Sequence, residues 1–336
     1  MTIRRFGLIG CGAIADFHMK SLREIDCARL VCVSSRNENS AKEAGEREGA
    51  DWVTDYKELL ARPDIDIVCV TTSSGSHGAI GAEVLKAGKH LLMEKPIAMT
   101  VEEAETLLRL AEENGRLLSV ISPRRFEESL QLAKRAVTEG RIGKLLLIEA
   151  QTPFFRNQAY YDSADWRGTI AEDGGALMNQ GIHQIDLLLW LGGPVRSVCG
   201  RIATQTHRME AEDIGAAIVN FENGAMGTIM ASTSIRPGFP ASIKIFGEEG
   251  TIIIVGDAIT YWMVPGMEAD VRQDDVRAGG ASNPLGISHE NHKRQIADVI
   301  EAVSYDRAPY VTGQDGLNAV KLIHAIYHSS ASAMDM

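Results

Sequence analysis

The glycine-rich stretch GCGAIA at residues 10–15 constrains the fold more than any other feature of this sequence. It directly follows a short apolar strand and directly precedes a helix. In that position Gly10 allows a tight turn, Gly12 lets a pyrophosphate approach the backbone, and Ala15 permits close packing of the helix on the strand. The N-terminus of the helix offers free N–H groups and a positive dipole end to phosphates. Because a β-rich run follows at residues 28–35, the segment predicts a dinucleotide-binding βαβ unit.

Strands and helices continue to alternate through the first 124 residues. Strands are expected at 3–10, 28–35, near 52–53, 65–72, 90–96 and 117–122, and helices at 14–22, 38–48, 55–61, 77–87 and 100–114. The last of these helices begins with Thr100 and Glu103, the spacing of a capping box. Alternation of this kind produces right-handed βαβ units and a doubly wound parallel sheet.

The pattern changes after about residue 124. A helix at 127–139 and a long strand at 144–154 come first, and a helix at 175–193 follows. Runs at 195–206, 213–221, 224–234, 241–247, 250–255 and 258–264 are then separated by turn signals, which predicts a large, mostly antiparallel sheet. Residues 266–286 are expected to form an exposed loop, and helices at 289–304 and 313–331 close the chain.

A chain of 336 residues is longer than one core usually serves, so we expect an α/β protein of two domains. The first is a doubly wound, dinucleotide-binding domain at residues 1–124, and the second is an α+β domain at residues 125–336.

Charge and composition exclude several classes of function. The net charge of −11 argues against nucleic-acid binding, which needs a clustered basic surface. No apolar run reaches the ~18–20 residues of a membrane span, and the N-terminus lacks the long apolar region of a secretory signal. The five cysteines contain no Cys-x-x-Cys pair, so we expect small buried residues in a reducing cytoplasm and no metal site.

The end of the second strand bears on the choice of cofactor. An NAD site usually places Asp or Glu there, to accept a hydrogen bond from the ribose 2′-OH, whereas this chain has SSRN at residues 34–37. The hydroxyl of Ser35 and the guanidinium of Arg36 suit a 2′-phosphate, so we expect NADP to be preferred. The alternative is that Arg36 is a solvated loop residue and that the protein accepts both NADP and NAD.

Polar residues in two segments are candidates for the chemical step. Lys95, in Glu94-Lys95-Pro96, stands at the carboxyl end of a parallel strand, where it can exchange a proton with a substrate oxygen. On the helix at 175–193, Asn179, His183 and Asp186 lie at i, i+4 and i+7, so one helical face is expected to carry all three.

At this point the sequence resembles the glucose–fructose oxidoreductase / inositol dehydrogenase (Gfo/Idh/MocA) family over nearly its whole length. The resemblance rests on GCGAIA at 10–15, HGAIGAEVLKAGKHLLMEKP at 77–96, GRIGKLLLIEA at 140–150 and GGALMNQGIHQIDLLLWLGG at 174–193. It implies a Rossmann domain followed by an open-faced α/β domain, whose sheet often mediates dimers or tetramers. It also implies hydride transfer between a nicotinamide and a hydroxyl-bearing carbon, usually of a sugar or cyclitol.

Lys95 matches the position of the family's catalytic lysine, and His183 matches that of its catalytic histidine. The resemblance therefore implies that these two residues are catalytic. Inositol-dehydrogenase-like members have aspartate where this chain has Asn179. An amide cannot titrate, so proton handling is expected to fall on His183 and Lys95, with Asn179 binding or orienting the substrate. Asp186 is assigned either to the substrate site or to a structural bridge.

FFRNQAYYDSADWRGT at 154–169 concentrates Arg156, Tyr160, Tyr161, Trp166 and Arg167. Arginines and aromatic rings suit a ring-shaped, polyhydroxylated and even acidic substrate; the alternative is a loop packed at a subunit interface. Arg124 and Arg125 fall at the domain junction. The cofactor contacts are assigned to Gly10, Gly12, Ala13, Ile14, Ser35, Arg36, Thr72, Ser73, His77, Glu94 and Lys95.

The predicted function is that of an NADP-preferring dehydrogenase or reductase acting on a secondary alcohol or ketone of a sugar, sugar derivative or cyclitol. We expect a cytoplasmic homodimer or homotetramer that associates through the C-terminal sheet. Two alternatives stay open: an NAD-dependent glycosidase of the same fold, and a non-catalytic sensor that binds the dinucleotide. Retention of both Lys95 and His183 argues against the sensor.

Overall fold

The computed structural model describes residues 2–272 and 288–332. The chain forms two compact units, neither of which is continuous in sequence. Unit 1 comprises Met1–Pro123 and Ser288–Leu317, and unit 2 comprises Arg124–Ile287 and Asn318–Met336. The segment at Ser288–Leu317 thus packs with unit 1, although its place in the sequence predicted that it would join the second domain.

Unit 1 is built on a six-stranded parallel sheet, as predicted. Its strands are β1 (Arg4–Ile9), β2 (Ala28–Ser34), β3 (Asp51–Val53), β4 (Ile67–Val70), β5 (His90–Met93) and β6 (Leu118–Val120). They lie in the order β3-β2-β1-β4-β5-β6, so the winding reverses between β1 and β4. Ligands of such sheets bind at the carboxyl ends of the strands on either side of this reversal.

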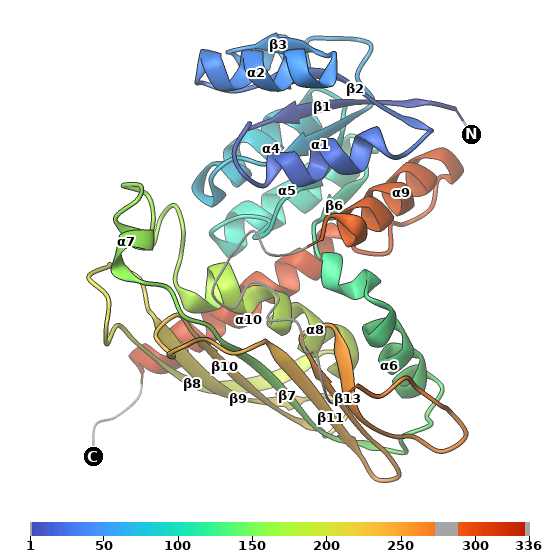
Figure 1. The fold of residues 1–336 in the computed structure, drawn as a ribbon, viewed down its shortest axis with the longest axis vertical. Coiled ribbons are helices and arrows are strands. Elements are labelled where there is room, and N and C mark those ends of the chain that lie inside the picture. The colour runs from blue at the N-terminus through green and yellow to red at the C-terminus, as the bar shows by residue number, and fades with distance from the viewer. Residues whose placement is uncertain (1, 273–287, 333–336) are drawn as a thin grey trace. The chain divides into compact units, whose positions relative to one another are not determined.

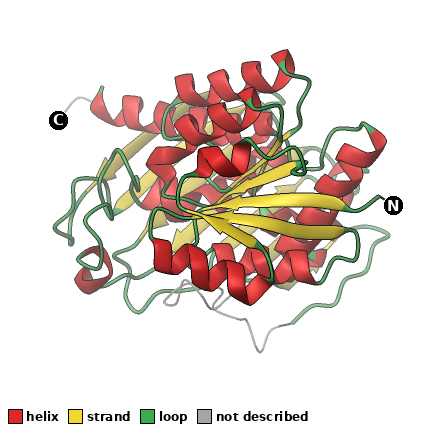
Figure 2. Ribbon diagram, turned by 90° about the horizontal axis from the view of Figure 1, so that it is seen from above, coloured by secondary structure: helices red, strands yellow, loops and turns green. Residues whose placement is uncertain are grey.

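Helices lie on both sides of the strands of unit 1 (Figure 2). They are α1 (Ala15–Arg23), α2 (Glu38–Glu48), α3 (Tyr56–Leu60), α4 (His77–Lys86), α5 (Val101–Glu113) and α9 (Glu290–Tyr305), with a 3₁₀ turn at Ser74–Ser76. The capping box predicted at Thr100 and Glu103 is confirmed, because each side chain bonds the backbone N–H of the other residue. Burial of both faces explains why the strands read as unbroken apolar runs.

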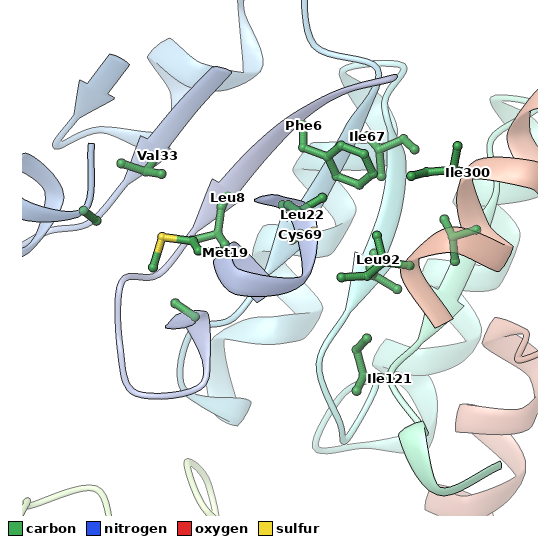
Figure 3. Close-up of a cluster of buried hydrophobic side chains, with 14 residues drawn as sticks. Phe6, Leu8, Met19, Leu22, Val33, Ile67, Cys69, Leu92, Ile121 and Ile300 are labelled. Atoms are coloured by element: carbon green, nitrogen blue, oxygen red, sulfur yellow. The ribbon is translucent and has the colours of Figure 1, made fainter. Parts of the chain in front are cut away.

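The core of unit 1 joins segments from both ends of the chain. Phe6 and Leu8 of β1 and Ile67 of β4 pack in one cluster with Ile296 and Ile300 of α9 (Figure 3). All five side chains are fully buried, and each such burial contributes about 1.5–3 kcal/mol. Helix α9 is therefore part of the core of this unit.

Unit 2 contains a seven-stranded sheet in the order β13-β12-β11-β7-β10-β9-β8 (Figure 1). Its strands are β7 (Leu145–Pro153), β8 (Val195–Ala203), β9 (Ile214–Phe221), β10 (Met226–Ser232), β11 (Ser242–Gly247), β12 (Thr251–Val255) and β13 (Ala258–Met263). The pairing of β7 with β10 is parallel and the other pairings are antiparallel. The prediction of a mostly antiparallel sheet is confirmed.

One face of this sheet is covered and the other is open. Helix α8 (Ile182–Gly192) packs on β7, β10 and β11. The strand register places the exposed side chains of Ile218, Met226, Tyr261 and Met263 on the opposite face. The other helices are α6 (Glu128–Thr138), α7 (Gln158–Tyr161) and α10 (Gly313–Ala331), of which the residues from Asn318 onward belong to unit 2.

The helix predicted at 175–193 is less regular than its sequence suggests. It begins with a π-helical segment at Ala176–Gly181 and continues as α8, which changes the direction of the side chains before Ile182. One wide turn leaves the apolar spacing almost unchanged, so periodicity does not reveal it. The loop expected at 266–286 lies mostly outside the described residues.

Candidate functional site

The glycine loop after β1 has the geometry that a dinucleotide needs. Gly10 has a φ of +102°, and a Cβ there would lie 2.8 Å from the carbonyl of Thr71. At Gly12 a Cβ would meet no atom within 4 Å, so the backbone faces open space. Ala13 is exposed, and Ile14 is the N-cap of α1 and makes no side-chain cap hydrogen bond; the N–H groups of Ala15 and Phe17 donate to the carbonyls of Gly12 and Ile14. The loop thus fits a pyrophosphate at the start of α1.

The residues after β2 carry no acidic group at the position expected for ribose recognition. Arg36 is exposed and Ser35 is half-buried, its hydroxyl accepting a hydrogen bond from the backbone of Asn37. The side chain of Asn37 caps α2 by accepting from the backbone N–H of Ser40. A cavity of about 260 Å³ adjoins the glycine loop and is lined by Cys11, Gly12, Ala13, Asp16, Met19, Ser40, Glu43, Ala44 and Arg47.

His77 joins the loops that follow β4 and β5. Its Nδ1 lies 2.7 Å from the carbonyl oxygen of Pro96, and its Nε2 lies 3.2 Å from the carbonyl oxygen of Thr72. The ring is buried, and that burial lowers the pKa of His77. Thr72 and Ser73 are half-buried in the loop after β4. The ring of His77 therefore links the loop after β4 to the loop after β5.

Lys95 is partly exposed at the end of β5 and directly follows a buried acid. The carboxylate of Glu94 accepts a hydrogen bond from the backbone N–H of Lys95 at 3.1 Å and lies 2.9 Å from Nε2 of His18. Nε2 of His292, on α9, lies 3.9 Å from Oε1 of Glu94. Burial opposes ionisation of Glu94, but the bond from His18 and the neighbouring positive charges lower its pKa to about 2. An ionised Glu94 thus holds the backbone that carries Lys95.

Sequence reasoning missed the two histidines of this cluster. His18 and His292 are buried, and burial lowers the pKa of His292 to about 4. They come from α1 and α9, at opposite ends of the chain. A lone histidine on an apolar helix gives no signal of such a partner, although position 18 lies one turn after the glycine loop.

In unit 2, Asn179 and His183 lie on successive turns of the π–α junction, and both are partly exposed. The side-chain amide of Asn179 donates to Oδ1 of Asp173. Oδ2 of the same carboxylate accepts the backbone N–H of Gly168 at 2.8 Å. Asp173 is buried, and no sequence pattern singled it out.

A second buried acid fixes the start of this helix. Oε1 of Glu212 accepts the backbone N–H of Leu177 at 2.9 Å and the hydroxyl of Tyr327 at 3.1 Å. Its main-chain carbonyl accepts the N–H of Ala176. Burial raises the pKa of Glu212 to about 6. Gly175 leaves room for this carboxylate, because a Cβ there would overlap Oε2.

Asp186, on α8, bonds to Arg125. It is buried and accepts two hydrogen bonds from Arg125, at 2.6 and 2.9 Å. Its carboxylate therefore forms a bidentate ion pair inside unit 2, the structural bridge that was one of the two alternatives for this residue.

The segment at 154–169 gathers cations and aromatic rings. The guanidinium of Arg167 lies 4.2 Å from the ring centroid of Tyr160 and 4.5 Å from that of Trp166. The guanidinium of Arg156 lies 5.6 Å from the Tyr160 centroid, and burial lowers the pKa of this side chain. Within residues 2–272 and 288–332, Arg167 forms no ion pair, and its Nε is buried without a hydrogen-bond partner. We call Arg156, Tyr160, Trp166 and Arg167 the cationic cluster.

Tyr161 stands behind this cluster. Its hydroxyl lies 2.7 Å from Oγ1 of Thr233, and its ring packs edge-on against His207. Nε2 of His207 lies 2.9 Å from the carbonyl oxygen of Arg156, and its Nδ1 lies 3.0 Å from Oδ2 of Asp213. These contacts anchor the backbone of the cationic cluster to the sheet.

Unit 1 thus carries a nucleotide loop and a lysine at the carboxyl ends of parallel strands, and unit 2 carries a histidine and an amide together with arginines and aromatic rings suited to a polyol. Such a combination defines an NAD(P)-dependent oxidoreductase. The chain belongs to the GFO/IDH/MocA oxidoreductase family: the family's NAD-binding Rossmann-fold model matches residues 4–122, and the GFO/IDH/MocA C-terminal domain model matches residues 130–253.

Individual dehydrogenases are similar to this chain over nearly its whole length. The WlbA dehydrogenase of Bordetella pertussis, solved in complex with NADH and UDP-GlcNAcA, is 34% identical with a TM-score of 0.90, and the match covers 99% of this chain and 97% of that one. The scyllo-inositol 2-dehydrogenase (NADP(+)) IolW of Bacillus subtilis is 28% identical, over 97% of this chain and 93% of the relative. The myo-inositol 2-dehydrogenase of Thermotoga maritima is 27% identical, over 96% and 94%.

Two further observations concern the part of the chain that the structure describes. None of its helices has the length and apolar character needed to cross a bilayer. No group of three or more His, Cys, Asp or Glu residues among residues 2–272 and 288–332 is arranged to hold a metal ion.

Proposed function

We propose that this enzyme moves a hydride between NAD(P) and a secondary alcohol carbon of a sugar derivative that carries a carboxylate. The observation that carries the proposal is Arg167, a cation held on two aromatic rings with no ion pair among the described residues. A guanidinium pairs with a carboxylate through two parallel hydrogen bonds, and the rings suit the face of a sugar. The 34% identical WlbA dehydrogenase binds UDP-GlcNAcA, a nucleotide sugar with such a carboxylate.

The roles of the residues follow from their chemistry. We assign cofactor binding to unit 1 and substrate binding to unit 2. The boundary between the two functions lies between residues 124 and 125. The open loop at Gly12 fits the pyrophosphate, and a bound nicotinamide supplies the hydride acceptor. Lys95 or His183 takes the proton of the substrate hydroxyl, and the other donates a hydrogen bond to the developing oxyanion. Asn179 has no titrating proton and orients the substrate.

The two catalytic assignments have a direct test. Lys95→Met and His183→Ala are each expected to lower kcat by at least about a hundredfold, the usual contribution of a general acid or base, while cofactor affinity stays within about threefold. Full turnover in His183→Ala would refute its role. Net reduction of NAD(P) by the wild-type enzyme also excludes the two rival functions, since a glycosidase shows no net cofactor turnover and a sensor shows none at all.

The acidic substrate is tested by paired substrates. We expect Arg167→Ala to lower kcat/KM for UDP-GlcNAcA by about 10–100-fold, the worth of a charge-assisted hydrogen bond, and to change activity on uncharged UDP-GlcNAc much less. Arg208→Ala removes an exposed arginine close to the same segment and serves as the matched control. Equal losses on both substrates would count against a carboxylate at Arg167.

We also propose that NADP is preferred, with Ser35 and Arg36 facing the 2′-phosphate. The support is the exposed guanidinium directly after β2, at a position where an NAD enzyme usually has an acid. Relatives of both cofactor types exist. Arg36→Asp should reverse the ratio of NADP to NAD affinity, and an unchanged ratio removes the assignment.

Finally, we propose a cytoplasmic homodimer or homotetramer joined through the open face of the unit 2 sheet. The exposed apolar side chains of this face, Ile218 and Met226 on β9 and β10 and Tyr261 and Met263 on β13, support the association, and five free cysteines agree with a reducing compartment. Ile218→Glu should shift the sedimentation coefficient to that of a smaller species. A monomeric wild-type protein would contradict this assembly.

A further inference from the structure

Asn179 differs from the acid expected at its position, and the structure shows where an acid lies instead. Asp173, six residues earlier, holds its carboxylate against the Asn179 amide. Asp173 is 2% exposed, whereas Asn179 is partly exposed.

We infer that Asp173 is a positioning residue, whose carboxylate joins the turn that carries Arg167 to the helical turn that carries Asn179 and His183. The inference rests on the proposed function, because it concerns how that site is held together. It also explains the amide at position 179, which has to donate a hydrogen bond to a carboxylate.

In the observed arrangement, each donor of these two bonds faces an acceptor. An ionised carboxylate offers acceptors alone, and here the backbone N–H of Gly168 donates to Oδ2 while the amide of Asn179 donates to Oδ1. An aspartate at position 179 would place two acceptors face to face, one of them on the buried Asp173. Such a pair has to share a proton, which raises one of the two pKa values.

Each end of this connection belongs to a rigid element. Gly168 has a φ of +72°, and a Cβ there would lie 2.8 Å from Cβ of Met209, so the turn after Arg167 has little room to shift. The carbonyl of Gly168 accepts the N–H groups of Glu210 and Ala211. The turn after Arg167 is therefore fixed, and the bond from Asn179 to Asp173 sets the position of the helical turn relative to it within unit 2.

At the other end, the backbone N–H of Asn179 bonds the carbonyl of Gly175, and His183 follows in the first turn of α8. The ionisable groups near Asp173 include the phenols of Tyr160 and Tyr161 on α7, whose pKa values burial raises, so neither ionises at neutral pH. They also include His183, four residues beyond Asn179, and the guanidinium of Arg167, in the turn before Gly168.

Three variants of the full-length enzyme test the inference through donor and acceptor matching. Asp173→Asn leaves one acceptor oxygen for two donors, and Asn179→Asp leaves two acceptors opposed. The double variant D173N/N179D exchanges the two side chains. Its amide at position 173 accepts from Gly168 and donates to the carboxylate at position 179, so both bonds are made again. Asp162→Asn, which changes an exposed acid of the same segment, is the control.

The expected results differ by variant. Each single change should lower kcat/KM for UDP-GlcNAcA at pH 8 by about 10–100-fold, and the double variant should recover to within about threefold of the wild type. Asn179→Asp should add a new ionisation to the pH profile of kcat/KM, with activity rising as the shared proton binds. Asp162→Asn should match the wild type throughout.

A second readout does not need activity. In Asn179→Asp, the folded protein binds a proton more tightly than the unfolded chain, so its thermal midpoint should approach that of the wild type as pH falls from about 8 to about 5. Two results would overturn the inference: single variants with the kcat/KM and thermal midpoint of the wild type, or a double variant whose loss of kcat/KM equals the product of the two single losses. If the wild type oxidises no sugar, the proposed function fails while the thermal readout still decides whether Asp173 and Asn179 form this pair.

Discussion

Glu212 makes a quantitative prediction about stability. It is buried, its Oε1 accepts the Leu177 N–H and the Tyr327 hydroxyl, and burial raises its pKa from an ordinary 4.5 to about 6. A difference of about 1.5 in pKa corresponds to about 2 kcal/mol of preference for the neutral form in the folded protein. Above pH 6 the folded state carries this cost in full, and the cost disappears as pH falls from about 6 to about 4.5.

Glu212→Gln removes the charge and keeps an oxygen for both donors. We expect the variant to be more stable than the wild type by about 1–2 kcal/mol at pH 8 and indistinguishable from it near pH 4.5. Urea unfolding followed by tryptophan fluorescence across this range measures the difference, and m-values should not change. Glu222→Gln, at an exposed position in the β9–β10 turn, should show no such dependence on pH. A variant that is less stable at pH 8, or a difference independent of pH, would refute the reasoning.

Three other changes give further expected outcomes. Asp186→Ala leaves the buried guanidinium of Arg125 without its carboxylate, so urea unfolding should show a loss of about 3–5 kcal/mol. Glu94→Gln keeps an acceptor for the backbone of Lys95 but loses the charge beside it, so kcat, measured by NAD(P) reduction, should fall about tenfold. Gly12→Ala adds a methyl group in open space, so thermal stability should be retained while cofactor affinity falls at least about tenfold.

The parts of this fold that follow from local rules were predictable from the sequence. Parallel strands buried on both faces read as apolar runs, as at 65–72, and the glycine pattern at 10–15 carries its own structural context. The turn signals of unit 2 likewise predict successive strands. Lys95 was selected because a strand end in such a sheet is a chemically distinct position.

The rest depends on contacts between distant or irregular segments. His18 and Glu94 are 76 residues apart, and nothing in either local sequence indicates that they meet. Asp173 lies in a loop without periodicity, so its bond to Asn179 has no sequence signature. The π-helical turn at Ala176–Gly181 alters the side-chain directions without altering the apolar spacing, and the bond between Asp186 and Arg125 joins residues 61 positions apart, so neither has a local sequence signature.

The place of α9 in unit 1 has a consequence for synthesis. A nascent chain that has emerged to Pro123 already contains every strand of the parallel sheet, yet it lacks Ile296, Val299 and Ile300, which pack in the same cluster as Phe6 and Leu8. At about 5–20 residues per second, the ribosome needs roughly 10–40 s more to reach the end of α9. During that interval an apolar surface of the nucleotide unit stays uncovered. The unit made first is therefore completed almost last, once α9 has been synthesised.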